Sequence, residues 1–224
     1  MLLLLVSSTA FEIRETAAWL NNQSHGLNAL KAKLLISGIG QLQTTFALQN
    51  QISISRPDLV IQAGIGGSVS KEDIGKTFAI GSEILADLGL MEKSGFSSIF
   101  KMGLEESGRF PFQEGKLINP YRDLLEWTGL KVLEGQTVNE IKSSDINGFQ
   151  RNQRTVVESM EGAALHYVCL MEKIPFLQIR SVSNILGDRD KSRWKIKEAV
   201  EDLHKTLVFL INKLEIADET LFRI

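Results

Sequence analysis

Glu12 is the first residue whose type and position could do chemistry. It follows an apolar segment, residues 2–6, that is typical of a buried strand, and a short Ser-Ser-Thr turn. Open α/β sheets bind ligands beyond the carboxyl ends of their strands, and a carboxylate placed there could activate a water as general base. The alternative is structural, because the helix dipole favours an acidic side chain in a first helical turn.

Two glycine-containing segments follow later expected strands, at residues 38–40 (Gly-Ile-Gly) and 64–67 (Gly-Ile-Gly-Gly). Glycine allows a tight turn and a close backbone approach to a ligand, so both are predicted to be turns at a site, with ordinary strand-to-helix turns as the alternative. Neither completes the dinucleotide pattern G-x-G-x-x-G, because Thr44 and Val69 stand where a third glycine would be sought. The chain contains no P-loop, H-E-x-x-H or Cys/His ligand cluster, so neither a metal nor a cofactor is implied.

Two polar segments complete the candidates. Residues 158–164 place Met160 and Glu161 at the junction of an expected strand and helix, where the alternative is an ordinary surface glutamate. Residues 180–184 end an apolar strand with a polar cluster, as suits a pocket, because buried amides and hydroxyls need partners. The alternative for this segment is a turn that caps the last helix through Asp190 or Ser192.

Composition limits the function classes. The formal net charge is -2, so nucleic acid is not an expected partner. The single cysteine, Cys169, excludes an internal disulfide and fits a reducing compartment; it and the three histidines, His25, His166 and His204, are expected to pack rather than react. The apolar N-terminus has no basic region and is too short for a signal peptide, and no segment is long enough to span a bilayer. A cytoplasmic protein with no membrane partner is expected.

The pattern of short apolar runs and longer helical segments predicts one α/β domain over residues 1–224, with helices on both faces of the sheet. The last helix is the clearest, because its apolar residues repeat at helical spacing. Residues 92–115 show no clear period and are expected to form a long excursion. Strands are predicted at 2–6, 32–36, 58–63, 77–80, 83–88, around 132, 155–157 and 176–182. Helices are predicted at 12–20, up to about 51, 119–127, 160–171 and 195–214.

Taken in order and spacing, these positions resemble the nucleoside phosphorylase and nucleosidase superfamily, especially the 5′-methylthioadenosine/S-adenosylhomocysteine nucleosidases. The resemblance covers nearly the whole chain. It implies a three-layer α/β/α sandwich with a mostly parallel central mixed sheet, and a homo-oligomer, dimer or larger. The residues that carry the resemblance are Glu12, 37–40, 57–67, 157–164 and 180–184.

The resemblance also implies roles for individual residues. A glutamate matching Glu12 activates the catalytic water, and one matching Glu161 binds the ribose hydroxyls, with Met160 against the sugar. The family carries an aspartate in an Arg-x-x-Ser-Asp segment that protonates the purine at N7, and here Asn184 stands in its place. The other residues that the resemblance places against the nucleoside are Ser8, Thr9, Gly64, Ile65, Gly66, Val138, Asn139 and Ser183.

Asn184 has a chemical consequence for the base. An amide cannot act as an acid, but its NH2 group can donate hydrogen bonds to N7 and to a 6-oxo oxygen, which favours hypoxanthine or guanine over adenine. Within the superfamily, residues 158–163, 181–184 and 187–190 with Trp194 resemble the futalosine hydrolases, which release hypoxanthine from futalosine in a route to menaquinone. The benzoate of futalosine would need an arginine, with Arg109, Arg189 and Arg193 as candidates.

Three alternatives stay open from the sequence. The protein could be a methylthioadenosine/adenosylhomocysteine nucleosidase, a purine phosphorylase, or a nucleoside-binding protein without activity. Phosphorylases of this fold hold phosphate with arginines, one commonly after the glycine turn of the third strand. Residues 64–67 offer no such cation, which favours hydrolysis. Residues 96–112 are a candidate for completing the neighbouring subunit's 5′ pocket.

Overall fold

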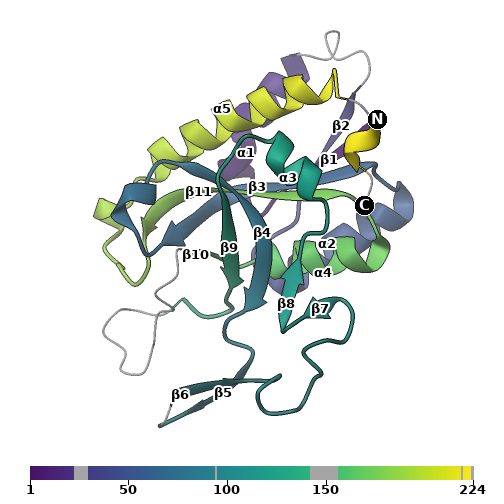
Figure 1. Cartoon of the computed structure of the whole chain (residues 1–224). Coiled ribbons are helices and arrows are strands. Elements are labelled where there is room, and N and C mark those ends of the chain that lie inside the picture. The colour runs from purple at the N-terminus through teal and green to yellow at the C-terminus, as the bar shows by residue number, and fades with distance from the viewer. Residues whose placement is uncertain (23–29, 94, 142–155, 218, 223–224) are drawn as a thin grey trace.

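A computed structural model describes residues 1–22, 30–93, 95–141, 156–217 and 219–222 (Figure 1). His25 and Thr155 lie outside these ranges. The strands are β1 Leu2–Ser7, β2 Lys31–Ile36, β3 Leu59–Ser68, β4 Thr77–Leu85, β5 Gly89–Glu92, β6 Gly95–Ser98, β7 Phe112–Gln113, β8 Lys116–Ile118, β9 Val132–Thr137, β10 Val156–Ser159 and β11 Phe176–Ile185. The helices are α1 Ala10–Asn22, α2 Gln41–Ile54, α3 Arg122–Trp127, α4 Gly162–Glu172 and α5 Ile196–Leu214.

The predicted mixed α/β architecture is confirmed. The main sheet has the order β2-β1-β3-β10-β9-β4-β8-β7, and β11 lies between β3 and β4. Five strand pairs are parallel, namely β1–β2, β1–β3, β3–β11, β4–β9 and β9–β10. The antiparallel pairs are β3–β10, β4–β11, β4–β8 and β7–β8. Because β3, β11, β4, β9 and β10 pair in a closed circuit, the centre of the sheet curls into a ring.

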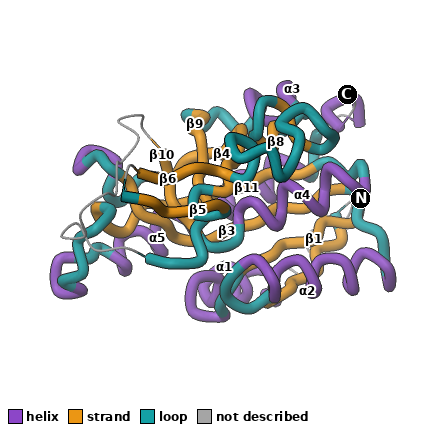
Figure 2. The backbone as a smooth tube through the Cα atoms, turned by 90° about the horizontal axis from the view of Figure 1, so that it is seen from below, coloured by secondary structure: helices purple, strands orange, loops and turns teal. Residues whose placement is uncertain are grey.

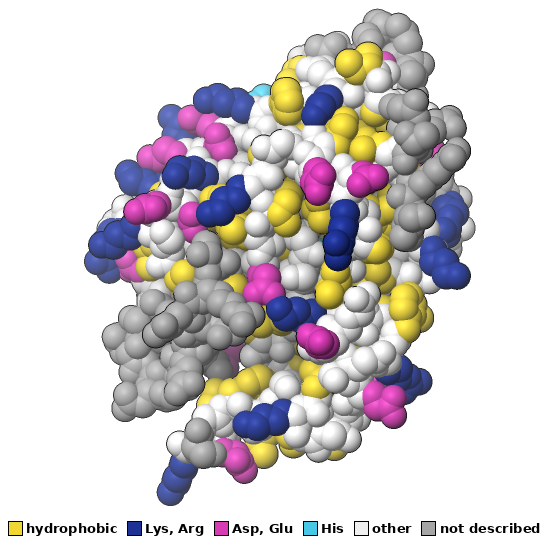
Figure 3. All heavy atoms as spheres, in the orientation of Figure 1, with side chains coloured by type: hydrophobic (Ala, Val, Ile, Leu, Met, Phe, Trp, Pro, Cys, Tyr) yellow, Lys and Arg dark blue, Asp and Glu magenta, His cyan; other side chains and the backbone are white. Residues whose placement is uncertain are grey.

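The helices cover two sides of this sheet. Helices α1 and α5 contact one another on one side, and α2 packs against α4 on the other. Figures 1 and 2 show α5 running across β3 and β11, with α2 and α4 beyond the strands. Over α5, in the upper left of Figure 3, basic and acidic side chains are interspersed, as the ion pairs Lys195–Glu198 and Lys197–Glu201 illustrate. No helix in the described part of the chain has the length and apolar character needed to cross a membrane.

The segment 64–67 was predicted to be a turn, and this prediction was wrong. Strand β3 continues through it to Ser68 and pairs with β11 along its length. The glycines serve close packing instead: a Cβ on Gly66 would lie 2.8 Å from the backbone oxygen of Glu158, and one on Gly64 would lie 2.5 Å from the Arg180 guanidinium. The other predicted turn is confirmed, since Gly38 and Gly40 have φ values of 82° and 88°, which favour glycine.

Other boundaries also differ from the prediction. Strand β4 is continuous through Gly81, where its pairing with β9 shifts register by a bulge. Helix α3 begins at Arg122 rather than Asn119, because Pro120 disfavours helical backbone in the residue before it. Helix α4 begins at Gly162, two residues later than predicted. The excursion contains the β5–β6 hairpin and the short strand β7.

The apolar face of α5 should determine much of the stability. Leu207 is fully buried in the core cluster, whereas Phe209 on the same helix is 57% exposed. Leu207→Ala should therefore reduce the free energy of unfolding by about 2–5 kcal/mol, while Phe209→Ala should change it by less than about 0.5 kcal/mol. Urea unfolding of both variants checks this, and equal costs would contradict the packing described.

Candidate active site

A cavity of about 300 Å³ lies beyond the carboxyl ends of β1, β3, β10 and β11. The structure brings Glu12, Glu161 and Asn184 together on its wall, although they are far apart in the chain. Most of the other predicted contact residues line it too, namely Ser8, Thr9, Ile65, Gly66, Val138, Met160 and Ser183. The sequence candidates therefore converge on one cavity.

Glu12 belongs to the first turn of α1 and caps it. Its Oε2 accepts hydrogen bonds from the Thr9 backbone N–H (3.1 Å) and from the hydroxyls of Ser8 and Thr9 (2.7 Å each). The Glu12 N–H donates in return to Thr9 Oγ1 at 3.4 Å. This is a capping box, so Glu12 has the structural role that was its alternative, and the local signal for that role is Thr-x-x-Glu.

The second oxygen of Glu12 is the one available for chemistry. Oε1 accepts one hydrogen bond, from the N–H of Ile65 at 3.0 Å. A carboxylate oxygen has about two lone-pair sites, so Oε1 keeps one site that could accept a proton from water. Because Oε2 has three partners, the orientation of the carboxylate is fixed before substrate binds.

Glu161 is held by two groups from elsewhere in the fold. It is the N-cap residue of α4, and its side chain is only 6% exposed. Its Oε1 accepts the N–H of Gly40 at 3.0 Å, and its Oε2 lies 3.5 Å from Arg180 Nη2. The positive-φ glycine turn thus presents a backbone donor to the carboxylate, which is a role that the turn prediction did not include.

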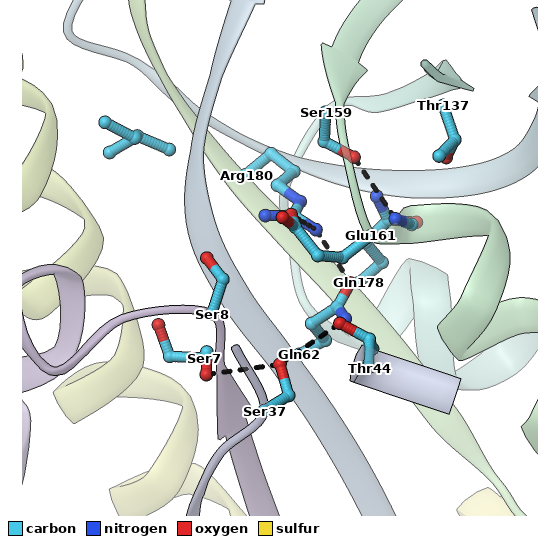
Figure 4. A network of polar contacts seen from close by, with 12 residues as sticks. Ser7, Ser8, Ser37, Thr44, Gln62, Thr137, Ser159, Glu161, Gln178 and Arg180 are labelled. Atoms are coloured by element: carbon cyan, nitrogen blue, oxygen red, sulfur yellow. Dashed lines mark hydrogen bonds and ion pairs between the residues drawn. The ribbon is translucent and has the colours of Figure 1, made fainter. Parts of the chain in front are cut away.

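Arg180 was not among the predicted site residues, yet it contacts one of them, Glu161. It lies within β11 at 1% exposure, and its Nη2 donates to Gln62 Oε1 at 2.7 Å. Figure 4 shows its guanidinium against Glu161, with Gln62 beside it. The available signal was an arginine in the middle of a predicted buried strand, because a fully buried guanidinium requires a nearby carboxylate.

Arg180 also provides a cation beside residues 64–67. Residues 64–67 have no basic neighbour in sequence, but β11 places Arg180 Nη1 directly against Gly64. The expectation that no cation lies beside this segment was wrong, because β3 and β11 pair in register at Arg180 and Gly64. This cation is already engaged with Glu161 and Gln62.

Asn184 lines the cavity, and its amide oxygen and nitrogen each already make one hydrogen bond within the protein. Its Oδ1 accepts the Ser183 hydroxyl at 2.8 Å, and its Nδ2 donates to the Ile185 carbonyl at 3.1 Å. An amide nitrogen carries two hydrogens, so in this orientation one remains for a purine rather than two.

Two predicted contact residues do not line the cavity. Gly64 is not part of the cavity lining, and both Glu12 and Arg180 lie close to it. Asn139 is engaged elsewhere: its Nδ2 donates to Asp87 at 3.1 Å, and its Oδ1 accepts from Gln41 at 3.2 Å.

The three candidate arginines for an acidic substituent lie in different surroundings. Arg189 lines the cavity, with its guanidinium 5.8 Å from the centroid of the Trp194 ring, which also lines it. Arg193 pairs with Asp188 and Asp190. Arg109 pairs with Glu105 and does not line the cavity.

The remaining reactive residue types are packed in the core. Burial raises the pKa of the Cys169 thiol, and it lowers the pKa of His166 to about 4, so neither suits a nucleophile or base at neutral pH. His204 Nδ1 is within 3.0 Å of Thr16 Oγ1, away from the cavity. The described residues include no cluster of three or more potential metal ligands.

Known proteins are similar to this chain in sequence and in fold. No family model matches the chain. Over 188 residues it is 28% identical to the futalosine hydrolase of Thermus thermophilus, covering 81% of this chain and 82% of that protein. Over 150 residues it is 31% identical to the futalosine hydrolase of Streptomyces coelicolor, covering 65% of this chain and 62% of that protein.

Solved structures show the same fold. A 5′-methylthioadenosine/S-adenosylhomocysteine nucleosidase from Colwellia psychrerythraea, in complex with adenine, superposes with a TM-score of 0.74 at 18% identity and covers 96% of each chain. The futalosine hydrolase of Helicobacter pylori gives a TM-score of 0.72 at 13% identity, covering 95% of this chain and 98% of that one. The predicted nucleosidase-like fold is therefore confirmed.

The packing at Gly64 generates a test of the site. In Gly64→Ala the added methyl would lie 2.5 Å from Arg180 Nη1 and 3.0 Å from Glu12 Oε1, so both charged groups must move. A displacement of about 1 Å at a reacting centre can cost on the order of 10²-fold in rate. We expect kcat/KM for base release to fall by about that factor, with an unchanged circular dichroism spectrum.

The matched control is Gly108→Ala, where a methyl meets nothing within 4 Å. It should retain wild-type activity. Full activity in Gly64→Ala would mean that the two charged groups need not keep their positions.

Proposed function

The chain belongs to the nucleoside phosphorylase and nucleosidase superfamily, and on that premise we propose that it hydrolyses the N-glycosidic bond of futalosine. The products are hypoxanthine and dehypoxanthine futalosine, in the futalosine route to menaquinone. The observation that carries the proposal is the convergence of Glu12, Glu161 and Asn184 on one cavity. The sequence relatives named futalosine hydrolase support the choice of nucleoside.

In this proposal the geometry divides the reaction among three side chains. Glu161 accepts hydrogen bonds from the ribose hydroxyls. Oε1 of Glu12 takes a proton from a water whose oxygen bonds to C1′, and the electrons of the broken N9–C1′ bond move onto the purine. Carboxylates near the sugar stabilise the positive charge that develops there, and an amide donor from Asn184 stabilises the negative charge on the base.

Hydrolysis rather than phosphorolysis is favoured by the partners of Arg180. A phosphorylase needs a cation free to bind phosphate near C1′, and Arg180 already contacts Glu161 and Gln62. Free base should therefore form from futalosine at the same rate with and without phosphate. Sugar phosphate among the products, or base release from methylthioadenosine in preference to futalosine, would select one of the alternative enzymes.

Two further properties belong to the proposal. A homo-oligomer, dimer or larger, is supported by apolar side chains at the cavity that stay open to solvent in the single chain: Phe11 is 53% exposed and Ile39 is 55% exposed. A nucleoside substrate and the single, buried Cys169 fit the cytoplasm.

Glu12→Gln removes the base while preserving the size of the side chain. Loss of a general base lowers kcat by about 10²–10⁴-fold, with futalosine still bound. The control is Glu15→Gln, an exposed residue of the same helix, which should leave kcat unchanged. Near-wild-type turnover by Glu12→Gln would exclude it as the base.

Asn184→Asp tests recognition of the base. An aspartic acid can protonate N7 and accept a hydrogen bond from a 6-amino group, so this variant should prefer aminofutalosine to futalosine, reversing the order expected of the wild type. Chromatography of free adenine and hypoxanthine from an equimolar mixture measures the ratio. An unchanged ratio would mean that other groups distinguish the 6-substituent.

A further inference from the structure

Among the described residues, one fully buried carboxylate takes no part in the proposed mechanism. Glu83, in β4, is fully buried and does not line the cavity. Its Oε1 accepts a hydrogen bond from Gln178 Nε2 at 2.7 Å, and its Oε2 accepts one from Thr137 Oγ1 at 2.9 Å. Because a buried carboxylate is costly even when it is hydrogen-bonded, a purely structural position would be better served by an apolar side chain.

Glu83 lies against the first turn of α4. A Cβ on Gly162, the first residue of that helix, would lie 2.0 Å from Glu83 Oε1, and one on Gly135 of β9 would lie 2.2 Å from it. Thr137 continues the contact, since its Oγ1 accepts the N–H of Ala163 at 2.8 Å. The carboxylate is thus connected to the second residue of α4 through one hydroxyl, and two glycines leave room for it.

We propose that Glu83 is a positioning residue for Glu161, holding the first turn of α4 so that the adjoining N-cap carboxylate meets the ribose. The inference rests on the ribose-binding role of Glu161 in the proposed function. Glu161 itself is joined to the body of the fold by Gly40, from the turn before α2, and by Arg180, from β11. Glu83 supports the opposite side, the helix from which Glu161 projects.

The charges around Glu83 make its effect depend on pH. The charged groups that act on it are Arg180 from β11 and Glu161 at the N-cap of α4. His166 of α4 interacts with Gln178, which also donates to Glu83, while Lys116 of β8 and Glu134 of β9 pair with one another. Burial raises the pKa of Glu83 to about 7, and the hydrogen bonds from Gln178 and Thr137, together with the charge of Arg180, partly oppose this. Protonation places a hydrogen on one carboxyl oxygen, and this O–H needs an acceptor in addition to the two hydrogen bonds that the ionised carboxylate accepts. Donation from this O–H to Thr137 would reverse the hydrogen bond that links Glu83 to the start of α4.

The test measures binding in the Glu12→Gln background, where substrate is not consumed. At pH 8, adding Glu83→Gln should weaken futalosine binding by about tenfold or more, and should leave the binding of free hypoxanthine unchanged, because hypoxanthine has no ribose. In the Glu12→Gln parent, futalosine affinity should fall as the pH drops through about 7, and this step should be missing with Glu83→Gln. Isothermal titration measures both ligands.

Folding of the variant is checked separately. The raised pKa means that ionisation of Glu83 destabilises the fold as pH rises through about 7, so Glu83→Gln should melt no lower than its parent at pH 8. If it melts at a lower temperature than its parent, two variants at Thr137 test the positioning role instead. Thr137→Val removes the hydroxyl and should weaken futalosine but not hypoxanthine binding, while Thr137→Ser should retain parental affinity.

Glu172→Gln is the control, because it removes a carboxylate at the far end of the same helix; it should leave both affinities unchanged. Equal loss of futalosine and hypoxanthine binding, or a preserved pH step in Glu83→Gln, would overturn the positioning role. Failure of the wild type to release base from futalosine would instead overturn the proposed function. The two failures are therefore distinguishable.

Discussion

A buried guanidinium needs a carboxylate beside it, and this requirement joins the parts of the site. Arg180 lies at 1% exposure in β11, with Glu161 at 3.5 Å and the Gln62 amide oxygen at 2.7 Å. Removal of one partner from such a pair leaves an uncompensated charge, which costs several kcal/mol. Since the groups come from β11, β3 and the start of α4, their pairing sets the relative positions of the segments that form the cavity floor.

Glu12 shows how one carboxylate can serve both structure and chemistry. Its two oxygens have different surroundings: Oε2 accepts three hydrogen bonds from the residues that cap α1, and Oε1 accepts one from Ile65. The capping bonds hold the side chain in one orientation, so little rearrangement is needed when water binds. Such fixed polar groups are what lowers the barrier for a reaction that separates charge.

Some glycines at the site are needed because a neighbouring side chain occupies the place of a Cβ, and others because of their backbone conformation. Gly64, Gly135 and Gly162 each lie where a methyl group would meet a charged side chain, namely Arg180 or Glu83. In each case the neighbour comes from a different strand or helix, so the reason for the glycine appears only when the sheet is assembled. At Gly38 and Gly40, by contrast, positive φ values require glycine locally.

The sequence by itself determined the five helices and the strands β1–β4 and β9–β11, but not the short strands β5–β8. It also determined the apolar face of α5 and the chemical types at Glu12, Glu161 and Asn184, because these follow from local periodicity and from residue type at strand ends. Only the tertiary structure decided that residues 64–67 continue a strand, that Arg180 lies against Gly64, and that Asn139 is held by Asp87. Those facts depend on register between β3 and β11 and on contacts between distant segments. Neither is encoded in the spacing of neighbouring residues, because strand pairing is chosen by the packing of the whole sheet.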